Sequence, residues 1–186
     1  MKKFILASAS PRRKDILLKA GYSFNIITSD KENNDFTLLP EELAVKNATI
    51  KAMDVFKKVC DENAVVLGAD TVVALGKEVF GKPEDETDAE RIIKRLSGKT
   101  HKVITGYAIV SGKGSEYGYE ITEVEFNRLS DEKIKEYIKD GSCMDKAGAY
   151  GIQDGYGLVK GYKGDYNNVV GLPIDRIKGK LEEFLR

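Results

Sequence analysis

Apolar residues recur along the chain in two patterns, one typical of β-strands and one of amphipathic helices. A near-continuous apolar run over residues 64–75 predicts a central strand that is buried on both faces. Residues 119–127 predict another strand, in which Thr122, Val124 and Phe126 alternate with Glu123 and Glu125, so that one face lies in water. Shorter strands are expected over residues 3–7, 22–28 and 101–110.

Helical periodicity and capping residues predict five helices between and after these strands. Ser10 offers an N-cap and Pro11 the first position of a helix that ends before Gly21. Thr87 and Glu90 have the spacing of a capping box for a helix that ends before Gly98. The other helices are expected over about residues 40–58, 130–139 and 173–184. Because strands and helices are interspersed and part of the sheet is antiparallel, the sequence predicts an α/β fold with a mixed sheet.

Composition narrows the class of protein. The 186 residues suit one sizeable domain spanning 1–186. Thirty basic and thirty acidic residues give no net charge, which argues against a nucleic-acid or membrane-surface binder. The two cysteines are too few for a disulfide framework, and the N-terminal apolar run is too short for a signal peptide. A cytoplasmic protein is expected.

The first candidate for chemistry is Ser8-Ala9-Ser10 followed by Pro11-Arg12-Arg13, between the first strand and the first helix. Free N–H groups and the dipole at a helix N-terminus favour an anion. Arg12 and Arg13 add donors that suit phosphate oxygens. The alternative interpretation is a capped helix with solvated arginines.

The second candidate is Asp70, which interrupts the apolar run of the central strand. A carboxylate is costly to bury unless it is paired or bound to a metal. Asp70 could therefore activate water as a general base, ligate Mg²⁺, or do both. The alternative is an aspartate that caps a turn at the end of the strand.

Two lysines could serve the same site. Lys51 shares a helical face with alanines and valines, so it could reach a phosphate or pair with Asp70. The alternative is a lysine that extends from the edge of this face into water. Lys82 lies in a Gly-Lys-Pro turn shortly after the Asp70 strand.

The segment 145–153 is the last candidate. Its glycines imply that the backbone closely approaches another group. Gln153 could offer a donor and an acceptor to a base edge. Tyr150 could stack on a base, although a core tyrosine is the alternative. The single histidine, His101, is expected to be structural.

These blocks, together with residues 96–101 and 169–173, resemble the Maf family in type and order over nearly the whole chain. The resemblance implies an elongated mixed α/β fold with two lobes around a cleft, similar to inosine-triphosphate pyrophosphatases. It also implies a cytoplasmic nucleotide pyrophosphatase that depends on a divalent metal (Mg or Mn), with a nucleoside triphosphate as its partner and a homodimer possible. Neither a nucleic acid nor a membrane is expected as a partner.

Within that family, the chain is similar to the branch that acts on dTTP and UTP, because it has Pro-Arg-Arg, Asp70-Thr71 and Gln153. The branch acting on 7-methyl-GTP has Pro-Tyr-Arg, Asp-Gln and a glutamate near the last position. The resemblance implies that Asp70 is the proton acceptor while water attacks the α-phosphorus, leaving a monophosphate and pyrophosphate. It implies substrate discrimination by Arg12, Thr71 and Gln153, and phosphate binding by Ser8, Ser10, Arg13, Lys51 and Lys82.

One block departs from the family pattern. The loop after the second strand usually has paired acids, whereas this chain has Glu32 beside Asn33. The second carboxylate, which would share the metal with Asp70, could be Glu32 or Asp35. The competing function is a non-catalytic nucleotide-binding regulator of cell division or septum formation, for which Asp70 would be dispensable.

Overall fold

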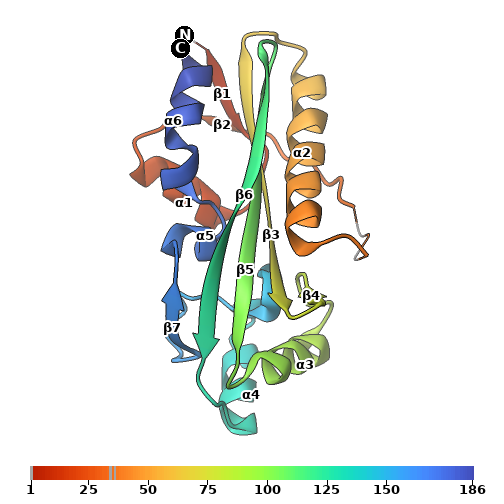
Figure 1. Ribbon diagram of the computed structural model, residues 1–186, viewed down its shortest axis with the longest axis vertical. Coiled ribbons are helices and arrows are strands. Elements are labelled where there is room, and N and C mark those ends of the chain that lie inside the picture. The colour runs from red at the N-terminus through yellow and green to blue at the C-terminus, as the bar shows by residue number, and fades with distance from the viewer. Residues whose placement is uncertain (1, 34, 36) are drawn as a thin grey trace.

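A seven-stranded mixed sheet forms the centre of the protein (Figure 1). The computed structural model describes residues 2–33, 35 and 37–186. The strand order is β2-β1-β3-β5-β6-β7, with β4 paired to β3. Strand β1 is parallel to β2 and β3, and the other pairings are antiparallel. The strands are β1 (Lys3–Leu6), β2 (Asn25–Ile26), β3 (Ala64–Leu75), β4 (Glu78–Phe80), β5 (Thr100–Ser111), β6 (Gly114–Phe126) and β7 (Val159–Lys163).

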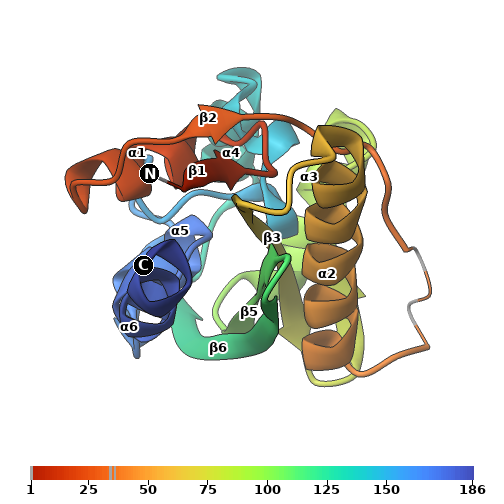
Figure 2. The ribbon, with the colours of Figure 1, turned by 90° about the horizontal axis from the view of Figure 1, so that it is seen from above.

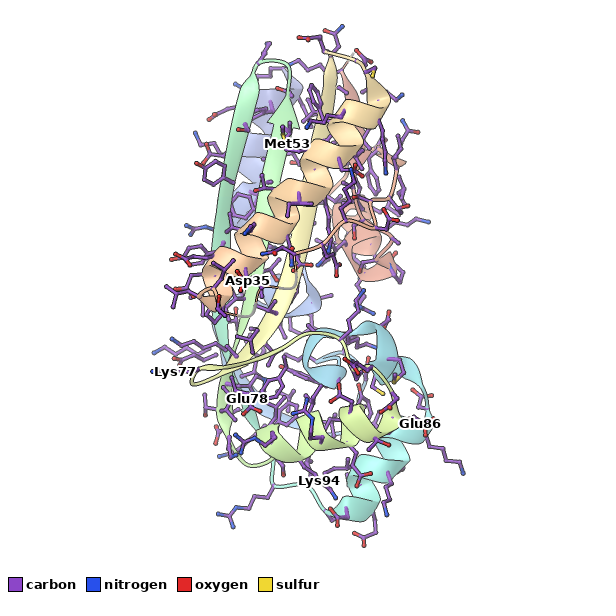
Figure 3. The ribbon with its side chains drawn as sticks, turned by 90° about the vertical axis from the view of Figure 1, so that its right-hand side faces the viewer. Asp35, Met53, Lys77, Glu78, Glu86 and Lys94 are labelled. Carbon is purple, nitrogen blue, oxygen red and sulfur yellow. The ribbon has the colours of Figure 1, made fainter. Side chains whose placement is uncertain are left out.

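Helices cover the sheet in two lobes. Figure 2 shows α2 on one side of the curled sheet, with α1, α5 and α6 on the other. Helices α3 and α4 pack together at the far end of the long strands, where Glu86 and Lys94 mark α3 in Figure 3. The helices are α1 (Pro11–Lys19), α2 (Pro40–Val59), α3 (Glu86–Leu96), α4 (Asp131–Lys139), α5 (Tyr166–Val170) and α6 (Ile174–Leu185). Two 3₁₀ turns, η1 (Ser142–Asp145) and η2 (Ala147–Ala149), follow α4.

The hydrophobic core is divided in the same way. One cluster joins α3 and α4 to the ends of β3, β5 and β6. A second joins α1 and α6 to β1 and β3, and smaller clusters lie under α2. The expected α/β fold with an elongated mixed sheet and flanking helices is confirmed. No helix of the described residues is both long and apolar enough to cross a membrane.

Helix α2 lies unusually close to the sheet. A Cβ atom at Gly68 would lie 2.3 Å from the carbonyl oxygen of Ala48, and one at Gly106 would lie 2.3 Å from the carbonyl carbon of Ala44. Only glycine at these two strand positions permits the helix backbone to approach so closely. The contact lies beside Asp70, which pairs with Gly106 across the strands. Side chains of α2 one turn apart can therefore reach Asp70.

Several predicted elements differ from the structure. The capping box of Thr87 and Glu90 is wrong, because α3 begins at Glu86 and the carboxylate of Asp85 caps it, accepting from the Asp88 amide at 2.7 Å. The strand expected over 22–28 is reduced to Asn25–Ile26, because this edge strand pairs only with the four-residue β1. Strand β6 begins at Gly114, earlier than expected, because its first residues continue the hairpin with β5.

Candidate active site

A cavity of about 270 Å³ lies between the two lobes. Its lining comes from the β1–α1 loop, the loop after β2, helix α2, strands β3 and β5, the turn after β4, the segment from η1 to residue 153, and α5 with Gly171. All ten predicted site residues line it: Ser8, Ser10, Arg12, Arg13, Glu32, Lys51, Asp70, Thr71, Lys82 and Gln153. Asp35 is not among the lining residues. It accepts hydrogen bonds from Thr37 near the start of α2 (Figure 3).

The start of α1 supplies one end of the cavity. The Ser10 side chain caps the helix by accepting from the Arg13 amide, and the Ser8 hydroxyl accepts from the Ser10 amide at 3.2 Å. Pro11 takes the first helical position, where no N–H is needed. Pro11 has no N–H, and the Arg13 and Lys14 amides both donate to Ser10. Among the residues that the structure describes, the Arg12 amide is therefore the one N–H of this turn left for a ligand.

Arg13 is held by the protein rather than by solvent. Its guanidinium donates to the Gly171 carbonyl at 2.8 Å, to Ser8 Oγ at 3.0 Å and to Thr71 Oγ1 at 3.1 Å. Burial lowers the pKa of Arg13, and the nearby negative charge of Asp70 opposes this effect. A guanidinium has five N–H groups, so two remain for a ligand. The alternative of solvated arginines is wrong for Arg13.

Arg12, in the first turn of α1, forms an ion pair with Asp145 of η1. Its Nη1 lies 2.8 Å from Asp145 Oδ2, and its Nη2 donates to the Asp145 carbonyl at 3.0 Å. Burial raises the pKa of the Asp145 carboxyl, but the hydrogen bond and charge of Arg12 outweigh it and the net shift is downward. The Asp145 carboxyl therefore stays ionised, and its contacts with Arg12 join α1 to η1 beside the cavity.

Asp70 lies in the middle of β3, and each oxygen of its carboxylate contacts a side chain of α2. Lys51 Nζ is 2.7 Å from Asp70 Oδ1, and Asn47 Nδ2 donates to Asp70 Oδ2 at 3.2 Å. The alternative of a turn-capping aspartate is therefore wrong. The alternative of a solvated Lys51 is also wrong, because this lysine is 7% exposed.

Glu32 also contacts the ammonium group of Lys51, which is paired with Asp70. Lys51 Nζ lies 2.6 Å from Glu32 Oε1, so one cation holds the carboxylates of Glu32 and Asp70 together. Burial alone would raise the pKa of Glu32. The hydrogen bond and charge of Lys51, with Lys82 and Arg13, outweigh burial and lower it. Glu32 is therefore ionised at neutral pH, and both carboxylates face the cavity.

Thr71 belongs to a hydrogen-bond chain of fixed direction. Its Oγ1 lies 2.9 Å from Thr105 Oγ1, and Thr105 donates to the Asn168 carbonyl at 2.9 Å. A carbonyl oxygen can only accept, so the single hydroxyl proton of Thr105 is used in that hydrogen bond. The Thr71 hydroxyl must therefore donate its own proton to Thr105 Oγ1. Thr71 then accepts from Arg13. Its hydroxyl has only acceptor capacity left for a ligand.

The segment 145–153 lines the cavity with Asp145, Lys146, Ala147, Tyr150, Gly151 and Gln153. Tyr150 is 5% exposed, and its hydroxyl lies 2.7 Å from His101 Nε2, so it is a core tyrosine. Gly148 has a φ of 71°, and a Cβ there would lie 2.7 Å from Val73 Cγ2. Its close approach is thus to the protein itself. Gln153 lines the cavity with an exposed side chain.

Comparison with known proteins agrees with these features. The family profile described as Maf-like protein matches residues 3–184. The chain belongs to the Maf family. A dTTP/UTP pyrophosphatase from Thermococcus gammatolerans is 47% identical to this Maf protein, covering 97% of this chain and 95% of the relative. A dTTP/UTP pyrophosphatase from Ruminiclostridium cellulolyticum is 45% identical, covering 99% and 97%.

Among solved structures, a dITP/XTP pyrophosphatase from Mycobacterium abscessus aligns with 99% of this Maf protein and 98% of its own chain. The sequence identity is 14% and the TM-score is 0.47. A likeness of this degree is too low to support conclusions about the site.

Among the polar residues at the site that escaped sequence reasoning are Asn47 and Thr105. Asn47 donates a hydrogen bond to Asp70, and Thr105 orients Thr71 through the hydrogen bond between their hydroxyl groups. Asn47 lies one helical turn before Lys51, so the helical face that singled out Lys51 contained the signal for Asn47 as well. Thr105 had no such signal, because its position opposite Thr71 depends on the register of β3 and β5.

The carboxylate oxygens of Asp70 and Glu32 suit a hard divalent cation that also binds phosphate. No cluster of three or more His, Cys, Asp or Glu side chains occurs among the residues that the structure describes. Mg²⁺ is commonly bound by one or two carboxylates together with substrate phosphates. Asp70 and Glu32, held on one ammonium group, are such a pair.

Proposed function

We propose that this Maf protein hydrolyses nucleoside triphosphates, dTTP and UTP above all, to the monophosphate and pyrophosphate. Relatives named dTTP/UTP pyrophosphatase support the activity, since they match this chain over nearly its whole length. The single observation that carries the chemistry is the buried contact of Asp70 with Lys51 and Asn47 in a cavity that also contains the start of α1. A carboxylate thus lies beside N–H donors and cations whose chemistry suits phosphate.

In the proposed mechanism, Asp70 takes the proton of a water molecule that attacks the α-phosphorus. Each oxygen of its carboxylate already accepts one hydrogen bond and has a lone pair left. The bond to the bridging oxygen breaks, and negative charge develops on the departing pyrophosphate. The Arg12 amide at the start of α1, the remaining N–H groups of Arg13, and Lys82 would stabilise this charge, because fixed donors act strongly in a partly buried cavity.

The proposal includes a divalent cation, Mg²⁺ or Mn²⁺, with Asp70 and Glu32 as its protein ligands. Their proximity, maintained by Lys51, supports this assignment. When bound, the cation would neutralise phosphate charge and polarise a phosphoryl oxygen. Asp35 is not included, because it contacts Thr37 and is not part of the cavity lining.

Substrate choice is assigned to Arg12, Thr71 and Gln153. The exposed amide of Gln153 can both donate and accept, which suits the N–H and carbonyl groups along a uracil or thymine edge. Thr71 can only accept, as its hydrogen-bond chain requires. Arg12, clamped to Asp145, has a defined position beside the cavity.

Replacing Asp70 by Asn tests the proposal. With dTTP or UTP and Mg²⁺, we expect D70N to lower kcat by roughly 10²–10⁴-fold, because the proton acceptor is lost while shape is kept. Pyrophosphate release from a panel of triphosphates measures this effect. Turnover close to that of the wild type in D70N would contradict the general-base role. A wild-type protein that binds nucleotide without releasing pyrophosphate would support the non-catalytic regulator instead.

A further inference from the structure

The loop after β2 is attached to α2 by a series of polar contacts. Asp54 lies 2.5 Å from Lys31 Nζ and accepts from Ser29 at 2.8 Å. Lys51 contacts Glu32, and Asn47 contacts the backbone of Asn33. Positions 47, 51 and 54 lie on one face of α2, so the loop runs antiparallel to the helix along this face.

Asn47 is the only one of these three helix residues whose amide joins loop backbone to the Asp70 carboxylate. Its Oδ1 accepts from the Asn33 amide at 2.6 Å, and its Nδ2 donates to the Asn33 carbonyl and to Asp70 Oδ2, each at 3.2 Å. The side chain is 5% exposed. Both protons of Nδ2 are used, and a flipped amide would turn its oxygen toward a carboxylate and its N–H₂ toward an N–H. The orientation of Asn47 is therefore unique.

We propose that Asn47 is a positioning residue that sets the geometry of the carboxylate pair, an inference that rests on the proposed function of Asp70. Through Asp70 Oδ2 it fixes the rotation of the carboxylate, so that the remaining lone pairs point into the cavity. Through the Asn33 backbone it holds the neighbouring Glu32 against Lys51. Without Asn47, a single ammonium group would have to orient both carboxylates.

The close packing of α2 on the sheet makes this assignment possible. Gly68, two residues before Asp70, lies so close to the backbone of Ala48 that a Cβ atom at position 68 would not fit. Asn47 directly precedes Ala48, so its distance from Asp70 is set by contact between backbones rather than by flexible side chains. Side chains that orient a metal-ligating carboxylate, as Asp70 is proposed to be, commonly contribute about 10–100-fold to metal affinity or activity.

The test compares Asn47→Ala and Asn47→Asp with Asp54→Asn as the matched control. Asp54→Asn weakens the attachment of the loop at Ser29 and Lys31 and leaves every contact of Asp70 in place. Three measurements are made on each full-length variant. They are kcat and KM for dTTP with Mg²⁺, hydrogen–deuterium exchange of the peptide covering residues 29–33, and the Tm.

We expect N47A to lower kcat about 10–100-fold with KM for dTTP within about threefold, and to raise exchange in residues 29–33. N47D should lower kcat at least as far, since it places an oxygen against the Asp70 carboxylate. D54N should raise exchange in the loop with a kcat within about threefold of the wild type. Loss of kcat in N47A and N47D beyond that in D54N supports the proposal.

Two results would overturn the proposal. One is a kcat within twofold of the wild type in N47A or N47D. The other is a uniform rise in exchange across the chain in both variants, which would assign Asn47 to general stability. Failure of the proposed function is distinguishable, because it would appear as no pyrophosphate release by the wild type. Exchange in residues 29–33 would then still report whether Asn47 holds the loop.

Discussion

At the scale of the residue, the side chains around the cavity are each held by several protein partners. Lys51 serves two carboxylates, and Arg13 has three acceptors from three different segments. The sequence could predict Asp70 and Lys51, because a charge inside an apolar pattern is conspicuous. It could not predict Thr105, because its contact with Thr71 depends on how β5 is aligned with β3. Asn47 lies on the helical face that singled out Lys51, but an uncharged side chain there is less conspicuous than a lysine.

His101 gives a prediction about stability against pH. Burial lowers the pKa of His101 to about 4, and its Nε2 lies 2.7 Å from the Tyr150 hydroxyl. The unfolded chain binds a proton near pH 6.5, whereas the folded chain resists it until about pH 4. This stability is therefore present above pH 6.5 and is lost as the pH falls toward 4.

We expect the free energy of unfolding to fall by about 2–3 kcal/mol from pH 7 to pH 4.5 through His101 alone. Urea unfolding at both pH values measures it. The variant H101Q, which keeps a polar partner for Tyr150, should lose that part of the pH dependence. Equal losses in the wild type and in H101Q would show that His101 does not titrate in this range.

At the scale of the element, the contact of α2 with β3 and β5 determines the site. The helix itself was predictable from Pro40 and its apolar face, and the structure extends it to Val59. The short α5 was not, because five residues carry too little periodicity. The start of α3 was misplaced because several acidic and hydroxyl residues compete to cap it, and Asp85 does so.

Gly68→Ala tests this close contact. The new methyl group would collide with the Ala48 carbonyl at 2.3 Å, and backbone rather than a flexible side chain would have to move. We expect a loss of at least about 2 kcal/mol in the free energy of unfolding. Activity should fall as well, because Asn47 and Lys51 would move relative to Asp70.

Gly161→Ala is the control for Gly68→Ala, since no atom of the described residues other than its chain neighbours lies within 4 Å of a Cβ there. Its stability should stay within about 0.5 kcal/mol of the wild type. Denaturant unfolding of both variants provides the comparison. A Gly68→Ala protein as stable as Gly161→Ala would show that α2 can retreat from the sheet without cost.

At the scale of the whole molecule, the mixed sheet joins two lobes, and the cavity is built from both. Segments that are distant in sequence meet there, including α1, β3 and the η1–η2 turns. The alternation of strands and helices was sufficient to predict an α/β fold with a mixed sheet. Periodicity does not indicate which loops lie next to one another. The prediction that these segments form one site therefore rested on the resemblance to the Maf family. A single domain over residues 1–186 stays a prediction.

The fate of the attacking oxygen tests the central claim most directly. The wild-type protein is incubated with dTTP and Mg²⁺ in water enriched in ¹⁸O, and the products are identified by ³¹P NMR. Attack at the α-phosphorus predicts dTMP that carries one ¹⁸O and pyrophosphate that carries none. Release of orthophosphate, or ¹⁸O in pyrophosphate, would contradict the proposed reaction.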